Sequence, residues 1–540
     1  MEGERERSGA DRILLAALLL AAAVTWFEPR GSGLAEPDET RYAEIPREML
    51  AAGNLVVPLL NGLPYFEKPP LLYWSNAASF RLFGESPWAA RLPTRLAGLG
   101  TTALLVLSVA ARRGRREGLV AGVLLLASPI GFLMARTNLT DGMLAFFFTA
   151  TLLAARAAIE RRESRRPWLA LAALTGAAAA AAFLAKGLVA LALPGLILLI
   201  WCLATGRLAG LAALAASPAS PVFLVLAAPW FLMVERSHPW FLRFFFIHEH
   251  FERFATGAAR RPGPVYYFVP VFALGFLPGL AFFFAGARKA WRRTEDGFFH
   301  LVWFAVVFGF FSLSQSKLPP YVFVGIPAAA ALAARAVDGT RRPWVVQALL
   351  ATGLAVALVA HPVTRAFLTE SQLQGVIAPA LAILVVASWG AVLAAGNGAP
   401  LAVASLAVGW AAVLGSVVIG WPRVPQARLG EELAVAARAA GAPVRVPLVG
   451  YKDYVNGVSW ELKSPIPVAG YRGELEPEFE TSPRTRDALF WPADRFWALW
   501  KSGRPVLALV RLQDLVELMT AVPPARVVGS EGRHAIVANF

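Results

Sequence analysis

The chain has 540 residues, of which 57% are hydrophobic and only 16% are charged, and its formal net charge is +15. Soluble domains have a lower apolar share and a higher charged share, so this composition excludes an ordinary soluble protein and indicates a polytopic membrane protein. The positive charge does not predict nucleic-acid binding, because the arginines stand in short runs between apolar segments and form no continuous face. The single cysteine, Cys202, lies within an apolar segment and has no partner for an intrachain disulfide.

Thirteen apolar stretches are candidates to cross the membrane. Each approaches the ~17–25 residues that span a hydrocarbon core of ~30 Å. In chain order they are 12–29, 92–111, 118–135, 140–157, 168–185, 187–205, 208–233, 264–287, 298–315, 318–336, 343–361, 375–395 and 400–421. We expect a break within 208–233, because prolines interrupt it at Ser217-Pro218 and Ser220-Pro221.

The loops between these stretches carry basic clusters on one predicted side. The clusters lie at 112–116, 161–166, 288–293 and 341–342, and each follows an even-numbered span. Because positive loops stay in the cytoplasm, the first loop, the segment 234–263 and the tail after 422 should face outward. Alternatively, the basic amino terminus and the first apolar stretch are a cleaved signal peptide, which leaves the side of the first loop unchanged.

The composition predicts two domains. A membrane domain covers 1–423 and includes a first outer loop at 28–91 with helices at the membrane surface; a soluble domain covers 424–540. That tail is charged, and it alternates short β-type runs with amphipathic stretches, as a small α/β domain does. The β-type runs are 447–451, 505–511 and 534–540, and the amphipathic stretches are 427–440 and 512–521.

The first outer loop holds charged residues that are too polar for lipid. Residues 40–52 should form a helix that stops at Gly53-Asn54, with Asp38 placed either to cap it or to act in catalysis. Glu67 and Lys68 precede Pro69-Pro70, which keeps the pair out of a helix. They are either site residues or an exposed, solvated pair.

Further charged residues fall at the same predicted face. Asp141 lies at the outer end of the fourth span, as a helix cap or as a second functional carboxylate. His250 either binds a metal together with Glu67 or is simply hydrogen-bonded. Lys186 and Lys317 also lie at this surface, where reaching out to lipid headgroups is their alternative role.

Carboxylates, a histidine and several cations at a lipid–water boundary suit one kind of chemistry. Loss of a phosphate leaving group from a lipid-linked sugar builds negative charge on phosphate oxygen, and fixed cations stabilise that charge. A carboxylate can accept the proton of an incoming hydroxyl, a step that a phosphate acceptor does not need.

At these residues the chain resembles the ArnT-like glycosyltransferases and, more distantly, the protein O-mannosyltransferases of the GT-C superfamily. The similarity is strongest over 36–325. It is carried by five runs in order: Asp38 to Ile45, Asn61 to Trp74, Ala185-Lys186-Gly187, Glu249 to Phe254 and Ser316 to Tyr321. The resemblance implies a mainly α, polytopic GT-C fold of about 13 spans with a small C-terminal α/β domain outside the membrane.

The resemblance also implies an activity. The implied protein is a bacterial inner-membrane enzyme. It takes a sugar from a polyprenyl-phosphate donor, typically undecaprenyl phosphate, and transfers the sugar with inversion on the periplasmic side. The implied acceptors are lipid A, lipopolysaccharide or another cell-envelope glycan or protein. No particular sugar is implied, because the run Pro70 to Trp74 follows the broad family.

Roles for individual residues follow from the same match. The implied catalytic carboxylates are Asp38 and Asp141. The implied ligands of a divalent metal, zinc in the ArnT-like members, are Glu67 and His250. The implied donor-phosphate ligands are Lys68, Arg253, Lys186 and Lys317.

Two alternatives of another class remain. A transporter or flippase for a lipid-linked sugar would place ionisable residues near the membrane midplane and show broken helices in repeated halves, and neither pattern is evident. A receptor or scaffold would depend on the external tail and would tolerate Asp38→Asn.

Overall fold

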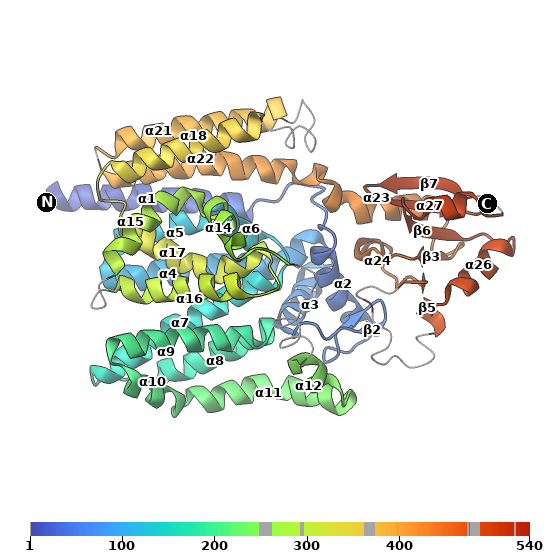
Figure 1. Ribbon diagram of the computed structural model, residues 1–540, viewed down its shortest axis with the longest axis horizontal. Coiled ribbons are helices and arrows are strands. Elements are labelled where there is room, and N and C mark those ends of the chain that lie inside the picture. Colours follow the sequence, from blue (N-terminus) through green and yellow to red (C-terminus); the bar gives the residue numbers. More distant parts are fainter. Residues whose placement is uncertain are drawn as a thin grey trace. The chain divides into compact units, whose positions relative to one another are not determined.

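The computed structural model describes residues 2–247, 262–291, 296–360, 373–396, 398–471, 475, 487–522 and 525–540. These residues form two compact units (Figure 1). The first unit comprises Met1–Phe27 and Thr94–Ile419. The second comprises Glu28–Pro93 and Gly420–Phe540, so it combines the first outer loop with the carboxy-terminal tail.

The first unit is a bundle of helices. Its helices are α1 (Glu2–Trp26), α4 (Pro87–Arg113, whose first turns belong to the second unit), α5 (Arg115–Leu126), α6 (Pro129–Arg136), α7 (Thr140–Glu163), α8 (Leu169–Lys186), α9 (Val189–Thr205), α10 (Leu208–Ala215), α11 (Ala219–Ser237), α12 (Phe241–Arg243), α14 (Phe268–Gly275), α15 (Leu280–Ala290), α16 (Gly297–Leu313), α17 (Ile326–Ala334), α18 (Arg342–Ala360), α21 (Ala378–Ala394) and α22 (Ala399–Gly420). Short turns η3 (Val265–Tyr267), η4 (Leu277–Gly279), η5 (Pro319–Gly325), η6 (Leu373–Ile377) and η7 (Trp421–Arg423) adjoin them.

All thirteen predicted stretches are largely helical, but they differ in length. Within the described chain, eight helices are long and apolar enough to cross a membrane, and two bent pairs raise that number to ten. The bent pairs cover 118–135 and 264–287 and bend by 72° and 81°. Stretches 187–205, 298–315 and 318–336 coincide with shorter apolar helices. The chain is therefore a multi-pass integral membrane protein, although the length criterion supports fewer than thirteen spans.

The break predicted within 208–233 is confirmed. Helix α10 ends at Ala215, and α11 begins at Ala219. Proline at 218 has no N–H to continue the first helix. The hydroxyl of Ser217 accepts the amide N–H of Ala219 at 3.2 Å, which satisfies one free donor at the start of α11.

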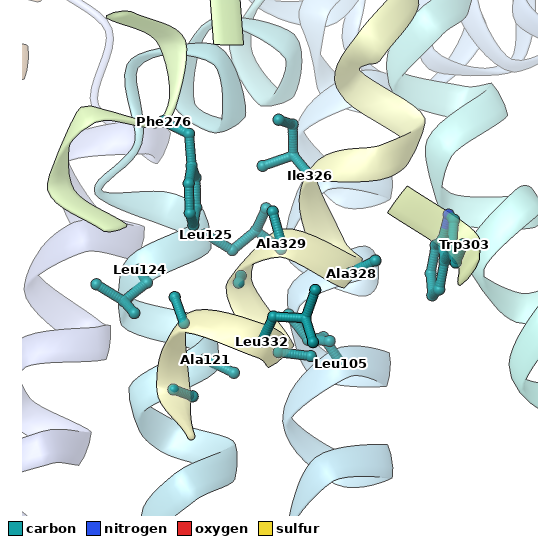
Figure 2. Close-up of a cluster of buried hydrophobic side chains, with 14 of the residues drawn as sticks. Leu105, Ala121, Leu124, Leu125, Phe276, Trp303, Ile326, Ala328, Ala329 and Leu332 are labelled. Carbon is teal, nitrogen blue, oxygen red and sulfur yellow. The ribbon is translucent and has the colours of Figure 1, made fainter. Parts of the chain in front are cut away.

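Helix α17 lies in the middle of the buried core of this unit. Figure 2 shows Ile326, Ala329 and Leu332 of this helix beside side chains of α4 and α5. Every residue of α17 is buried. Small side chains allow close approach: a Cβ on Gly286 of α15 would fall 1.8 Å from the carbonyl oxygen of Leu332. The missing side chain at Gly286 thus lets α15 pack against the backbone of α17 at short range.

An ion-pair network joins helix ends at one end of the bundle. Arg156 of α7 binds Glu160 one turn later, with the two atoms 2.9 Å apart, and also binds Asp296 before α16. Arg112 and Arg113, at the end of α4, reach Glu160 and Asp296 at 2.7 and 3.1 Å. The sequence predicted that the basic loops lie on one side of the membrane. The network places the ends of helices next to these loops at one end of the bundle.

The tail of the second unit folds around a six-stranded sheet in the order β5-β4-β3-β6-β8-β7. Strands β3 to β6 pair in parallel, and β8 pairs antiparallel with β6 and β7. The elements are α23 (Pro425–Ala439), β3 (Leu448–Tyr451), α24 (Asn456–Leu462), β4 (Val468–Ala469), β5 (Phe490–Trp491), α26 (Ala493–Lys501), β6 (Leu507–Arg511), α27 (Leu515–Met519), β7 (Arg526–Glu531) and β8 (His534–Ala538). The predicted small α/β region is confirmed.

The first loop packs against this tail within the same unit. It contains α2 (Asp38–Ala51), a hairpin of β1 (Leu59–Leu60) and β2 (Leu63–Pro64), and α3 (Leu71–Phe83). Helix α2 contacts α3, β1 and α24. Phe80 of α3 and Trp460 of α24 pack with ring centroids 5.5 Å apart inside a shared apolar cluster. Such burial stabilises both segments together.

Candidate functional site

The candidate residues of the second unit begin at the amino end of α2. The helix expected over 40–52 is present from Asp38 to Ala51. Its N-cap residue is Pro37, so Asp38 lies in the first turn, where the helix dipole favours a carboxylate. The side chain of Asp38 is 53% exposed, and its oxygen lies 3.4 Å from the Arg41 guanidinium.

Arg41 links this carboxylate to the next part of the loop. It is buried, and its guanidinium donates to the hydroxyl of Tyr65 at 3.5 Å. It also lies over the ring of Tyr42, 5.9 Å from the centroid. The sequence motifs did not single out Arg41, although its three-residue spacing from Asp38 places both on one helix face. An acceptor hydroxyl could approach Asp38 from solvent while the guanidinium of Arg41 balances the charge of the carboxylate.

Glu67 and Lys68 form a turn before Pro69-Pro70, outside any helix, as predicted. The Lys68 ammonium lies 3.8 Å from the Glu67 carboxylate and donates to the Glu67 carbonyl at 2.9 Å. Both side chains are mostly buried, so the pair is not simply solvated. The ammonium of Lys68 is therefore held by Glu67 in a partly buried ion pair.

Two buried tyrosines line this loop. Burial, reinforced by nearby charge such as that of Glu67, raises the pKa of Tyr65 and of Tyr73 well above its usual value, so both phenols stay neutral. The Tyr73 hydroxyl is buried and finds no hydrogen-bond partner among the described residues. Sequence motifs placed Tyr65 and Tyr73 in a family run but gave no sign that either would be buried.

A buried arginine holds the start of α2. Arg91, at the beginning of α4 and 2% exposed, donates to both carboxylate oxygens of Glu39 at 2.8 and 2.6 Å. It also pairs with Glu28 and donates to the carbonyl of Gly33 at 2.7 Å. Bidentate arginine–carboxylate pairs fix geometry as well as charge. This clamp was not predicted, because its partners lie far apart in the sequence.

Asp141 and Lys186 form the candidate pair of the first unit. Helix α7 begins at Thr140 with Leu139 as its N-cap, and α8 ends at Lys186. The two helices pack together, and the Lys186 ammonium hydrogen-bonds to an Asp141 carboxylate oxygen. The ammonium also lies 5.1 Å from the ring centroid of Tyr321. Both side chains are largely buried, so ion pairing replaces the capping and headgroup roles.

Lys317 has a different environment. It is 5% exposed, and its ammonium donates to the carbonyls of Ser312 and Ser314, each at 2.8 Å. These carbonyls lie at the carboxyl end of α16, where a cation satisfies free acceptors. Desolvation lowers the pKa of Lys317. This geometry favours a structural role over direct binding of a donor phosphate.

The remaining predicted ligands, His250 and Arg253, lie outside the described residues. Within the described ranges no group of three or more histidine, cysteine, aspartate or glutamate side chains could hold a metal. The carboxylate of Glu67 is paired with the ammonium of Lys68, and a neighbouring cation opposes metal binding. The described residues therefore do not by themselves supply a zinc site.

Two family models match different parts of the chain. Residues 12–250 match the model described as dolichyl-phosphate-mannose-protein mannosyltransferase. Residues 434–539 match the aminoarabinose transferase C-terminal domain. The first match covers the helices from α1 to α12 together with the first loop, and the second covers the sheet of the tail.

Curated relatives are similar over part of their length. The chain is 34% identical over 341 residues to undecaprenyl phosphate-alpha-4-amino-4-deoxy-L-arabinose arabinosyl transferase 2 of Proteus mirabilis, an alignment that covers 61% of this chain and 60% of that protein. A transferase of the same description from Edwardsiella ictaluri is 35% identical, covering 54% of this chain and 53% of the relative. The chain thus spans about six-tenths or less of the length of these two relatives.

Solved structures extend the likeness to the full chain. ArnT from Cupriavidus metallidurans, in the apo state and bound to undecaprenyl phosphate, superposes with a TM-score of 0.84 at 30% identity, covering 99% of this chain and 98% of that one. An Archaeoglobus fulgidus oligosaccharyltransferase, at TM-score 0.54 and 12% identity, covers 98% of this chain and 74% of its own and shares the fold alone. By its sequence motifs, its family models and its full-length structural likeness, this chain belongs to the ArnT-like family of GT-C membrane glycosyltransferases.

Proposed function

We propose that the protein transfers a sugar from an undecaprenyl-phosphate donor to an acceptor of the cell envelope, with inversion at the anomeric carbon. The observation that carries this proposal is the likeness over 99% of the chain to an ArnT structure bound to undecaprenyl phosphate. The curated relatives, which bear the names of aminoarabinose transferases, support a pentose such as aminoarabinose as the first sugar to test. A lipid-linked sugar transporter gains no support from these relatives.

The reaction breaks the bond between the sugar C1 and the donor phosphate oxygen and forms a bond from C1 to an acceptor oxygen. The electron pair of the broken bond stays on the phosphate, whose growing negative charge a fixed cation stabilises. Lys68, Lys186 and Arg253 are the candidates for this role, and Lys317 is a weaker one because it already binds backbone carbonyls. An inverting transfer needs no covalent sugar–enzyme intermediate.

Asp38 is the proposed catalytic carboxylate. It is half-exposed and sits beside Arg41, so it is accessible and has a cation to balance its charge. With a hydroxyl acceptor, Asp38 accepts the proton as C1 is attacked. With a phosphate acceptor, such as that of lipid A, no proton has to be removed. Asp141 is the proposed second carboxylate, and its ion pair with Lys186 keeps that cation in place.

A divalent metal held by Glu67 and His250 stays a separate proposal. It is tested by comparing transfer before and after chelation and by measuring zinc in the purified protein and in Glu67→Gln. Full activity after chelation, with no bound zinc in the untreated protein, would refute it. A metal in the wild-type protein that is lost from Glu67→Gln would support it.

The proposed location is the bacterial inner membrane, with the site, the first loop and the tail on the periplasmic side. Arg112 pairs with Glu160 near the end of α7, and Arg113 pairs with Asp296, which also binds Arg156 of α7; Asp141 lies at the other end of this helix. Helix α7 has 24 residues. At ~1.5 Å per residue it is about 36 Å long, enough to separate the two ends across a hydrocarbon core of ~30 Å. Basic loops at one end support a cytoplasmic placement for that end. In the same orientation, the proposed membrane domain, 1–423, crosses the membrane, and the proposed soluble domain, 424–540, lies on the periplasmic side.

The activity is tested with purified protein in detergent and a panel of radiolabelled undecaprenyl-phosphate sugars, using a lipid extract as acceptor. We expect one donor to lose its sugar to the extract and to release undecaprenyl phosphate in equal amount. Failure of every donor, with folded protein that binds undecaprenyl phosphate, would contradict transfer and favour carriage of the lipid.

A further inference from the structure

We propose that the carboxy-terminal tail positions the active first loop, and that Asn61 is the positioning residue through which it does so. The proposal assigns the tail a part in organising the site residues, rather than a role in acceptor binding alone. Its kinetic consequence rests on the transferase activity proposed above. The contacts that carry it lie entirely within the second unit.

Asn61 ties the first loop to the tail by two hydrogen bonds. Its side-chain oxygen accepts the amide N–H of Ile466 at 2.8 Å, and its side-chain nitrogen donates to the Ile466 carbonyl at 2.9 Å. Asn61 is fully buried. Ile466 lies just before β4, so the loop is attached directly at the sheet. A buried amide with both ends paired fixes one register, because any shift leaves polar groups unsatisfied.

The turn that presents Asn61 is held from the other side by α2. Asn61 and Gly62 join β1 to β2 with positive φ values of 52° and 74°, as a tight two-residue hairpin requires. The two carboxylate oxygens of Glu48 accept the amide N–H groups of Asn61 and Gly62 at 2.7 and 2.8 Å. The hairpin is therefore clamped between α2 and the tail.

From this hairpin the contacts continue to the site residues. The amide of Tyr65 donates to the Pro58 carbonyl at 2.8 Å, which closes the hairpin, and Glu67 and Lys68 follow within three residues. The Tyr65 hydroxyl accepts from Arg41, which lies 3.4 Å from Asp38. A displacement of Asn61 would thus reach both the proposed cation and the proposed catalytic carboxylate.

A second attachment lies next to Asp38. The amide N–H of Gly457, in α24 of the tail, donates to the carboxylate of Glu36. A side chain at Gly457 would crowd the backbone, because an added Cβ would lie 2.9 Å from the Cα of Gly430. The backbone of Glu36 also donates to the Gln426 carbonyl at 3.0 Å. The tail therefore holds the loop on both sides of α2.

The test compares Asn61→Gly with a matched control, Asn539→Gly, in the full-length protein. Glycine accepts the positive φ at position 61, so this change removes the link to Ile466 and spares the turn. Asn539 is also buried, and its side chain pairs with the backbone of Val506, Trp500 and Arg504, all within the tail. The readouts are kcat, KM for the donor, and hydrogen exchange of the segment 58–68.

For Asn61→Gly we expect exchange in 58–68 to accelerate by about tenfold or more. We expect kcat to fall roughly tenfold to a hundredfold, since small misplacements of reacting groups are costly, while KM for the donor changes little. Asn539→Gly should accelerate exchange within the tail and leave kcat within about twofold of wild type. Asn61→Asp, which keeps the acceptor for the Ile466 N–H, should fall between Asn61→Gly and wild type.

A wild-type kcat in Asn61→Gly would overturn the proposal, and so would an equal loss of kcat in both asparagine variants. If Asn61→Gly does not fold, a wild-type kcat and unchanged exchange in Asn61→Asp would overturn it instead. A wild-type protein that transfers no sugar contradicts the proposed function alone. In that case unchanged exchange of 58–68 in Asn61→Gly would still refute the link to the tail.

Discussion

Glu48 makes the stability of the first loop depend on pH, and Glu48→Gln should remove that dependence. The carboxyl group is 6% exposed. Burial, followed by the negative charge of Glu44, raises the pKa of Glu48 from 4.5 to about 8, although the amides of Gly62 and Asn61 and the charge of Arg47 work in the opposite direction. The folded protein therefore holds this proton more tightly than the unfolded chain does.

The sign and size follow from that difference. A raised pKa gives stability that is fully present below about pH 4.5 and is lost as pH rises through about 8. At ~1.4 kcal/mol per pH unit, the loss over this window of about 3.5 units is on the order of 5 kcal/mol. Glutamine cannot titrate, but it can accept only one of the two N–H groups, which costs ~1–3 kcal/mol. Glu48→Gln should thus be less stable than wild type near pH 5 and equal or more stable above pH 8.

The assay is hydrogen exchange of the segment 58–68 in the full-length protein, corrected for the intrinsic effect of pH on exchange. Glu431→Gln, an exposed change on α23 in the same unit, is the control and should follow the wild-type curve. The curves of wild type and Glu48→Gln should converge or cross as pH rises. A difference between them that stays constant across this range would refute the reasoning, because the proton of Glu48 would then play no part.

Three further changes test other parts of the structure. Arg91→Met removes the buried cation that Glu28 and Glu39 share, which costs ~3–5 kcal/mol, so we expect a lower Tm that Arg91→Lys restores only in part. An unchanged Tm would contradict the clamp. Lys186→Met should destabilise the bundle more than the double change Lys186→Met with Asp141→Asn, because the single change removes the cation that pairs with the buried Asp141 carboxylate. Additive effects in a double-mutant cycle would exclude coupling between the two residues. Burial acts to raise the pKa of Asp453, but its partners His534 and Arg511 hold that pKa below 3.8. The tail should therefore lose stability as pH falls below about 4. Asp453→Asn should abolish that acid sensitivity in thermal melts.

Local patterns in the sequence were enough for the apolar helices, for α2 and for strands β3, β6 and β8 of the tail, but not for β7. Hydropathy marks a span, and a short continuous apolar run marks a buried strand such as β6, because each signal lies within one continuous segment. Strands β4 and β5 contain two residues each and carry no such pattern. They exist because the neighbouring parallel strand supplies their hydrogen bonds.

In the candidate site, too, local patterns marked some residues, whereas contacts between distant segments were not predicted. The motifs marked Asp38, Glu67 and Lys68, but they did not reveal that Arg41 lies beside Asp38 or that the tail pairs with Asn61. Such contacts depend on which distant segments the fold brings together, and a single sequence holds no direct record of that choice. The ion pair of Lys186 with Asp141 of the neighbouring helix was not predicted, and the role of Lys186 as a donor-phosphate ligand stays a prediction.

The most direct test of the proposed catalysis is the rate of sugar transfer from an undecaprenyl-phosphate donor in wild type and in Asp38→Asn, with donor binding measured in parallel. With an acceptor that attacks through a hydroxyl, loss of the catalytic carboxylate should lower the rate at least ~100-fold while donor binding is retained. The control is Glu431→Gln, an exposed carboxylate-to-amide change on α23 that should keep the wild-type rate. With a hydroxyl acceptor, a wild-type rate in Asp38→Asn would contradict the role given to this carboxylate. The absence of transfer in wild type to both hydroxyl and phosphate acceptors would contradict the proposed activity.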